Sequence, residues 1–365
     1  MRPSTLTALL LLCPALSLAG GAGTGSADFL KIGLGARAEA MGGAFAAIAD
    51  DASAVYWNPA GLSQLMQQEA GFLHTQWLDG ISYEYFTYAA PHQEFGTLAG
   101  SFALLQKDSI PSYDETGASL GQTAVRNSAL TLGWGRSLLA QSLALGLGLK
   151  WIHEDLAGYQ ANSYAADLGA LYTAYQDRRV KLTAGLAIRH LGSHGAFISE
   201  RGELPRTLVL GFGLKTGDEK LAAGLDVIQA QNQSAPYPAL GVEYWLHPMW
   251  AVRAGYNAGL DGGSGFSSGI GFRVKSFEFD YAVADRGLLG LTHRGGVTFR
   301  FAGKTEALYQ EALGLMQQGY YAQAFFKFNK LLNLNPEDKR VVLRMKQCQQ
   351  HIEEELGKLR LNPKP

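Results

Sequence analysis

Large apolar residues alternate with small or charged residues along most of the chain, from about Glu69 to Phe301. Between Leu143 and Trp151, for example, every odd position is leucine or tryptophan and every even position is alanine, glycine or lysine. Successive side chains of a β-strand point to opposite faces, so a period of two predicts strands with one apolar and one polar face. The sequence therefore predicts a mainly β protein.

The alternating segments number about fourteen, and an even number is usual for single-chain bacterial barrels. Each segment has about the length that a tilted strand needs to cross a bilayer. We predict a transmembrane antiparallel β-barrel over residues 69–302, with strands at 70–78, 81–90, 95–106, 124–136, 141–154, 163–175, 179–191, 205–216, 219–229, 237–247, 249–258, 265–274, 276–285 and 291–301.

The polar face of these segments carries charged residues at intervals. A charge that faces hydrocarbon has a large free-energy cost, so these side chains are expected to line the lumen of the barrel. The lumen-facing candidates are Lys150, Asp167, Arg189, Lys215, Asp226, Glu243, Glu278, Asp280 and Arg300.

The connections between the segments alternate in length, as they do in outer-membrane barrels with short periplasmic turns and longer outer loops. The short turns are expected near 91–94, 137–140, 176–178, 217–218, 248 and 275. Apart from a short one near 79–80, the longer loops are expected near 107–123, 155–162, 192–204, 230–236, 259–264 and 286–290. A soluble β-sandwich, the alternative, gives no reason for this alternation. Aromatic residues near the segment ends, including the final Phe301, are typical of interfacial belts.

After Phe301 the period changes to that of helices. The stretch from Gly319 to Phe328, followed by Pro336, resembles one tetratricopeptide repeat, and a third helix is expected from about Asp338 to Leu359. This small α-helical domain at 303–365 should be periplasmic, because an even number of strands puts both barrel ends on one side. Its candidate partner-binding residues are Tyr320, Tyr321, Phe325 and Phe328.

The N-terminus has the features of an export signal at 1–19, with Arg2, an apolar core and a small-residue cleavage site at Ser17-Leu18-Ala19. Beyond it no run of 18 or more apolar residues predicts a membrane helix. The segment at 20–68 is rich in glycine and alanine and too short for a core of its own. It is expected to fold into the lumen as a hatch.

Composition and motifs argue against several classes of function. The net charge of −1 gives no basic surface for nucleic acid. The eight histidines are scattered without a zinc motif, and no catalytic motif is present, so we expect no enzyme activity, no metal and no cofactor. Asp50 and Asp51 could bind a cation, but pairing with Arg37 or with a lumen base is the favoured interpretation.

The N-terminal segment contains the blocks Gly33-x-Gly35-Ala36-Arg37, Met41-Gly42-Gly43-Ala44, Asp50-Asp51-Ala52-Ser53 and Tyr56-Trp57-Asn58-Pro59-Ala60-Gly61-Leu62. With these blocks the chain resembles the PorV/PorQ family, which is related to FadL-type fatty-acid transporters. The resemblance implies a FadL-like barrel with the Asn58-Pro59-Ala60 segment in the hatch. The candidate hatch and gating residues are Arg37, Asp50, Asp51, Asn58, Pro59 and Ala60.

Two functions follow as hypotheses. In the first, the protein lies in outer-membrane lipid and binds or passes a hydrophobic molecule, such as a fatty acid, under control of the hatch. In the second, it is a secretion or assembly scaffold of PorV type. The outer loops and the periplasmic helices would then hold a periplasmic or secreted protein partner.

Overall fold

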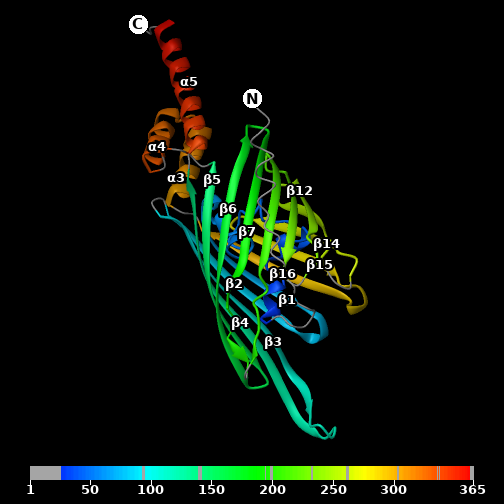
Figure 1. Ribbon diagram of the computed structural model, residues 1–365. Coiled ribbons are helices and arrows are strands. Elements are labelled where there is room, and N and C mark those ends of the chain that lie inside the picture. Colours follow the sequence, from blue (N-terminus) through cyan, green and yellow to red (C-terminus); the bar gives the residue numbers. More distant parts are fainter. Residues whose placement is uncertain are drawn as a thin grey trace, which may run out of the picture.

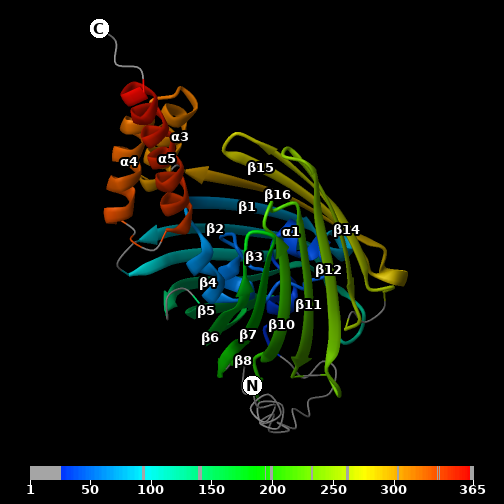
Figure 2. The ribbon, with the colours of Figure 1, turned by 90° about the horizontal axis from the view of Figure 1, so that it is seen from above.

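Within the part of the chain that the computed structural model describes, fourteen antiparallel strands close into a barrel (Figures 1 and 2). The described residues are 26–92, 95–138, 142–193, 195–197, 200–231, 233–259, 263–301, 304–334, 336 and 338–361. Neighbouring strands follow chain order, and β1 pairs with β16 to close the wall. The barrel strands are β1 (Gln68–Gln76), β2 (Ser82–His92), β3 (Gly96–Tyr113), β4 (Ser119–Leu138), β5 (Leu143–Leu156), β6 (Tyr159–Gln176), β7 (Val180–Ser193), β10 (Thr207–Thr216), β11 (Leu221–Ala230), β12 (Tyr237–His247), β13 (Trp250–Asn257), β14 (Phe266–Val274), β15 (Phe277–Asp285) and β16 (Leu291–Phe301).

The predicted fold class is confirmed, because each predicted strand segment corresponds to one barrel strand. The predicted loops at 107–123 and 155–162 are wrong: most of these residues extend the strands into hairpins. β3 and β4 pair as far as Tyr113 and Ser119, and β5 and β6 as far as Leu156 and Tyr159. Beyond the apolar band no face needs to be apolar, so a ladder can continue without the alternation that reveals it in the sequence.

The predicted loop at 192–204 also contains strand. The short strand β8 (Ala196–Phe197) pairs there with β9 (Glu200–Arg201) in a separate two-stranded sheet. The predicted signal peptide at 1–19 lies outside the described residues.

Burial alternates along the strands as the hydrophobic pattern predicts. In β5 the side chains of Leu145, Leu147 and Leu149 are exposed on the outside, whereas Ala144 and Lys150 are buried inside. The same outer face continues around the barrel through exposed leucine, valine, phenylalanine and tyrosine side chains. A continuous apolar surface of this extent is unfavourable in water and suits hydrocarbon.

The segment before the barrel, residues 26–66, fills the lumen, and we call it the lumen segment (Figure 2, blue). It forms the short helices η1 (Asp28–Lys31), α1 (Ala36–Ala40), α2 (Ala54–Trp57) and η2 (Pro59–Gln64). Met41, Phe45 and Ile48 are fully buried in it. The lumen segment therefore supplies much of the core that the inner wall packs against.

Glycines of the inner wall let the backbone of the lumen segment approach closely. A Cβ added at Gly255 would overlap the backbone nitrogen of Gly42, and one at Gly146 would overlap that of Ala60. Several of these glycines pair with one another across neighbouring strands, as Gly241 does with Gly255. We call the set the glycine belt: Gly135, Gly146, Gly169, Gly185, Gly211, Gly224, Gly241 and Gly255. No side chain larger than hydrogen fits at these wall positions while the lumen segment stays in place.

Three helices follow the barrel in the described region: α3 (Lys304–Gln317), α4 (Tyr321–Leu334) and α5 (Lys339–Leu361). They lie at the end of the barrel opposite the long β3–β4 hairpin (Figure 1). That end carries the short turns, and we call it the turn end. The helices pack around the buried side chains of Ala312, Ala324 and Phe328, a core separate from that of the barrel. Among the described residues, none of the helices combines the length and the apolar character that crossing a bilayer requires.

Candidate functional site

Arg37 links the lumen segment to the barrel wall. Its Nη1 lies 2.6 Å from Asp50 Oδ1 and 3.0 Å from Asp51 Oδ2, and its Nε and Nη2 donate to both oxygens of Glu243 in β12 at 2.8 and 2.9 Å. Burial alone would lower the pKa of Arg37, but Asp50 and Glu243 outweigh it and raise that pKa above its usual value. Lys215 in β10 also contacts Asp50, at 2.5 Å. Asp50 and Asp51 therefore pair with basic side chains, which is the interpretation that the sequence favoured over cation binding.

The ion pairs continue around the wall. Arg253 in β13 donates to Glu243 at 2.6 Å and pairs with Asp280 at 2.5 Å and Glu278 at 3.4 Å. Arg300 in β16 pairs with Glu278 at 2.6 Å. With Lys215, which joins it through Asp50, five predicted lumen residues thus meet in one network. Arg253 is not among the predicted lumen residues, although its odd position between Ala251 and Gly255 marks it as inward-facing.

Two further side chains bind the backbone of the lumen segment. Asp226 Oδ2 in β11 accepts hydrogen bonds from the backbone nitrogens of Phe45 and Ala46, both at 2.9 Å. Asn58 Nδ2 donates to the carbonyls of Ala46 and Ala170 at 2.7 and 3.1 Å, and Asn58 Oδ1 accepts from the nitrogen of Ala60 at 3.1 Å. Asn58 therefore shapes the turn into η2 and also attaches it to β6.

The Pro59-Ala60 peptide lies directly against the wall glycine Gly146. Pro59 and Ala60 are both buried there. The turn at Pro59 and Ala60 is therefore packed tightly against the wall.

The remaining predicted lumen residues form a second cluster on β5, β6 and β7. Lys150 forms an ion pair with Asp167, and its Nζ lies 3.1 Å from His190 Nδ1. The guanidinium of Arg189 lies 5.1 Å from the ring centroid of Tyr56 in the lumen segment. His190, with φ +61°, sits where the β6–β7 register shifts. Strict alternation would turn His190 outward when Arg189 faces inward, so the sequence pattern missed it.

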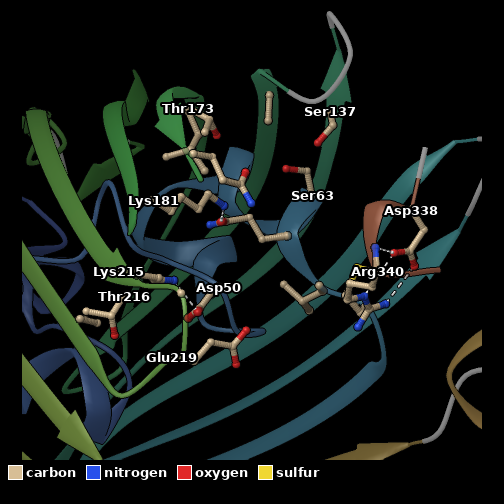
Figure 3. A pocket seen from close by; sticks show the side chains of 18 of the residues that line it. Asp50, Ser63, Ser137, Thr173, Lys181, Lys215, Thr216, Glu219, Asp338 and Arg340 are labelled. Atoms are coloured by element: carbon tan, nitrogen blue, oxygen red, sulfur yellow. Dashed lines mark hydrogen bonds and ion pairs between the residues drawn. The ribbon is translucent and has the colours of Figure 1, made fainter. Parts of the chain in front are cut away.

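A cavity of about 2640 Å³ opens at the turn end, between the barrel rim, the end of the lumen segment and the helical domain. We call it the mouth cavity. Figure 3 shows side chains from all three parts around it. The residues labelled there are Asp50, Ser63, Ser137, Thr173, Lys181, Lys215, Thr216, Glu219, Asp338 and Arg340.

The predicted partner-binding residues of the helical domain differ in exposure. Tyr320 is exposed, and Tyr321 stacks on His351 with ring centroids 4.4 Å apart. Phe325 is partly buried. Phe328 is fully buried, so the prediction that it contacts a partner at the surface is wrong.

Phe328 instead packs beside Tyr309, with ring centroids 5.6 Å apart, and fills the space that small Ala324 leaves between two helices. Phe326 is not among the predicted partner-binding residues, although its side chain is 78% exposed. It lies next to the apolar stripe of α4 rather than in it.

The charged side chains described above attach the lumen segment to the barrel wall. Within the described residues no group of three metal-ligating side chains could hold a metal ion. The buried charges of Arg37, Glu243 and Arg253 instead satisfy one another. Removing one member of such a network leaves an uncompensated buried charge, which costs about 3–5 kcal/mol. The network therefore holds the lumen segment against the wall.

Comparisons with known proteins give one family model and several solved structures. A model of UPF0164, described as an uncharacterised protein family, matches residues 21–132. No curated protein matches the chain. Among solved structures, the toluene transporter TodX of Pseudomonas putida is 14% identical with a TM-score of 0.50, and the match covers 73% of this chain and 96% of TodX.

Two further solved structures match at lower TM-scores. The toluene transporter TbuX of Ralstonia pickettii is 14% identical, with coverage of 74% and 98% and a TM-score of 0.48. A FadL homologue of Pseudomonas aeruginosa is 12% identical, with coverage of 73% and 98% and a TM-score of 0.47. The chain thus shares its barrel fold with TodX.

Proposed function

We propose that the protein is an outer-membrane barrel that binds hydrophobic small molecules or passes them across that membrane. The observation that carries this proposal is a closed barrel with an apolar outer face and a polar lumen occupied by its own N-terminal segment. TodX, whose fold is similar, is described as a toluene transporter. That description supports a hydrophobic substrate here by analogy.

In this proposal the lumen segment acts as a hatch, and Arg37, Asp50 and Asp51 hold it closed. The turn end faces the periplasm, because short turns gather there and because both barrel termini, Gln68 and Phe301, lie at that end. The tetratricopeptide-like helices would then be periplasmic as well.

Uptake by whole cells tests the proposal. We expect a Gram-negative host that expresses the protein to take up N-phenylnaphthylamine, a fluorescent hydrophobic probe, faster than the host with empty vector. Membrane fractionation and heat-modifiable gel mobility establish that equal amounts of folded barrel reach the outer membrane. Equal uptake by the two strains, with folded barrel present, would rule out a transport role.

A second candidate function is an assembly or secretion scaffold, related to the PorV resemblance. The exposed aromatic rings of Tyr320 and Phe326 in the helical domain favour it, since aromatic side chains are enriched at protein interfaces. Crosslinking in intact membranes followed by purification separates the two functions. A stoichiometric protein partner that is lost in a Phe326→Ser variant favours the scaffold.

A further inference from the structure

We infer that the mouth cavity binds an anionic amphiphile, with its charged head at Lys181 and its apolar chain against the helical domain. The inference rests on the proposed function, because it concerns a hydrophobic ligand at the periplasmic end of the same barrel. It adds a second site, outside the lumen, and assigns a role to the helices.

Lys181 supplies the charge for the head. Its side chain faces inward from β7 at the rim, and its Nζ donates to Gln64 Oε1 at 2.8 Å. Lys215 nearby has Asp50 as its partner, whereas no ion pair between described residues includes Lys181. Asp50 and Glu219 attract Lys181 from a greater distance, but neither forms a close ion pair with it. An ammonium that is partly withdrawn from water and lacks a close ion-pair partner favours a carboxylate or phosphate ligand.

Polar groups around Lys181 suit the same ligand. Thr173 on β6 and Ser63 on the lumen segment lie on the Lys181 side of the cavity, and Ser137 lies farther along the rim on β4 (Figure 3). The Ser63 hydroxyl donates to the carbonyl of Ala60 at 2.7 Å, so Thr173 is the nearby hydroxyl that can donate to a remaining oxygen of a carboxylate or phosphate head. The whole lining also has a positive balance, with nine arginines and lysines against six aspartates and glutamates.

The apolar part of the cavity lies on two sides. Leu65 and Met66 end the lumen segment on one side, and Leu331, Leu334 and Leu343 belong to the helical domain on the other. Met66, Leu334 and Leu343 are all exposed in the protein alone. An alkyl chain between them would remove this apolar surface from water, which stabilises the complex by roughly 25 cal/mol per Å².

The volume fits a lipid-sized ligand. The cavity of about 2640 Å³ is larger than the roughly 300–1,000 Å³ of a site for a small drug-like molecule. It leaves room for one or two long chains. The same chemistry fits a free alkyl carboxylate and a membrane phospholipid.

Binding of two matched probes tests the inference. The full-length protein is placed in phosphatidylcholine nanodiscs, and the fluorescence of 11-(dansylamino)undecanoate is compared with that of its uncharged alcohol analogue, each corrected with empty nanodiscs. We expect Lys181→Gln to weaken binding of the carboxylate about tenfold or more, because a charge-assisted hydrogen bond is lost, and to leave the alcohol unchanged.

A change in the helical domain tests the other end of the ligand. Leu343→Glu should weaken binding of both probes, because it places a charge on the apolar side. Lys275→Gln is the matched control, since Lys275 is an exposed lysine in the β14–β15 turn that does not line the cavity. It should bind both probes as the unchanged protein does. Heat-modifiable mobility verifies that every variant is folded.

Equal carboxylate binding by the Lys181→Gln variant and the unchanged protein would overturn the inference, and so would an inert Leu343→Glu substitution. Lipids extracted from the purified protein identify the source: a phospholipid lost in Lys181→Gln indicates membrane lipid, and a carboxylic acid lost there indicates cargo. Because the binding assay needs no uptake, it can succeed or fail independently of the N-phenylnaphthylamine experiment.

Discussion

Arg37 shows how single residues fasten the lumen segment. Three carboxylates surround it: Asp50 and Asp51 from its own segment and Glu243 from the wall. Because the site is buried, each charge depends on the others for compensation. The ion pairs therefore stabilise the protein jointly. Loss of the Arg37 guanidinium should destabilise both the lumen segment and the wall.

We predict that Arg37→Ala lowers the free energy of unfolding by roughly 3–5 kcal/mol, because three carboxylates lose their shared partner. Urea unfolding of the protein in detergent micelles, followed by tryptophan fluorescence, measures the change. Arg126→Ala is the control, since Arg126 pairs with Asp108 at 3.3 Å on the exposed surface. An exposed pair contributes about 0–1 kcal/mol. Similar losses in both variants would contradict a buried docking network.

Asp50 gives a prediction for pH. Burial raises its pKa, but Arg37 and Lys215 outweigh burial, so the pKa lies well below the usual value. The stability that this carboxylate provides is then complete above the unfolded pKa of about 3.9 and is lost as the pH falls further toward the folded pKa. Between pH 7 and about pH 3, the unchanged protein should lose more stability than Asp50→Asn, mostly below pH 4. Parallel curves would mean that Asp50 is not held ionised.

The wall residues of the candidate site could be found from the sequence only where alternation holds. Glu243 and Asp280 were identified because their strands keep a strict period of two, and the same rule marks Arg253. His190 could not be identified, because a shift of register at that point changes which side chains face inward. Nor does a period of two say which inward charges meet, since this depends on the register between strands.

At the scale of elements, the lumen segment and the wall fit each other through the glycine belt. The belt glycines come from successive strands, yet each faces a carbonyl, nitrogen or small side chain of the same segment. The sequence predicted that this segment lies in the lumen, from its small residues and its lack of a core. It could not predict the path, because segments of glycine and alanine have no periodicity that points to one face.

We predict that Gly255→Ala displaces part of the lumen segment. The added Cβ would overlap the backbone of Met41 and Gly42. Neither that backbone nor the backbone of the strand can move away as a flexible side chain could. Overpacking of this kind costs roughly 1–3 kcal/mol. Faster proteolysis within residues 26–66 and higher conductance in planar bilayers are the expected results. Gly295→Ala in β16 is the control, because its added Cβ meets no atom within 4 Å. If Gly255→Ala changes neither the proteolysis nor the conductance, the glycine belt tolerates side chains.

Among the described residues, the main buried apolar cluster of the barrel is separate from that of the helical domain. The larger one joins the lumen segment to the inner wall through residues such as Phe45, Tyr83 and Ile152, and the smaller one lies within the three helices around Phe328. The wall alone would present inward glycines and unpaired charges to an empty lumen. The barrel therefore depends on its own N-terminal segment more than on its C-terminal helices.

Two deletions of the chain test this dependence. A protein that ends after residue 302 keeps the closing strand β16 and the larger core, so we expect it to reach the compact, heat-modifiable form in gels with a midpoint of thermal unfolding close to that of the full chain. A protein that lacks residues 28–62 loses Arg37, one of the two bases that pair with Glu243, and also the partners of Asp226 and of the glycine belt. We expect it to remain mostly in the slow, unfolded band, because buried charges without partners and an unfilled lumen both destabilise the wall. A compact band of equal intensity in the two proteins would mean that the wall folds on its own and that the lumen segment is added to a finished barrel.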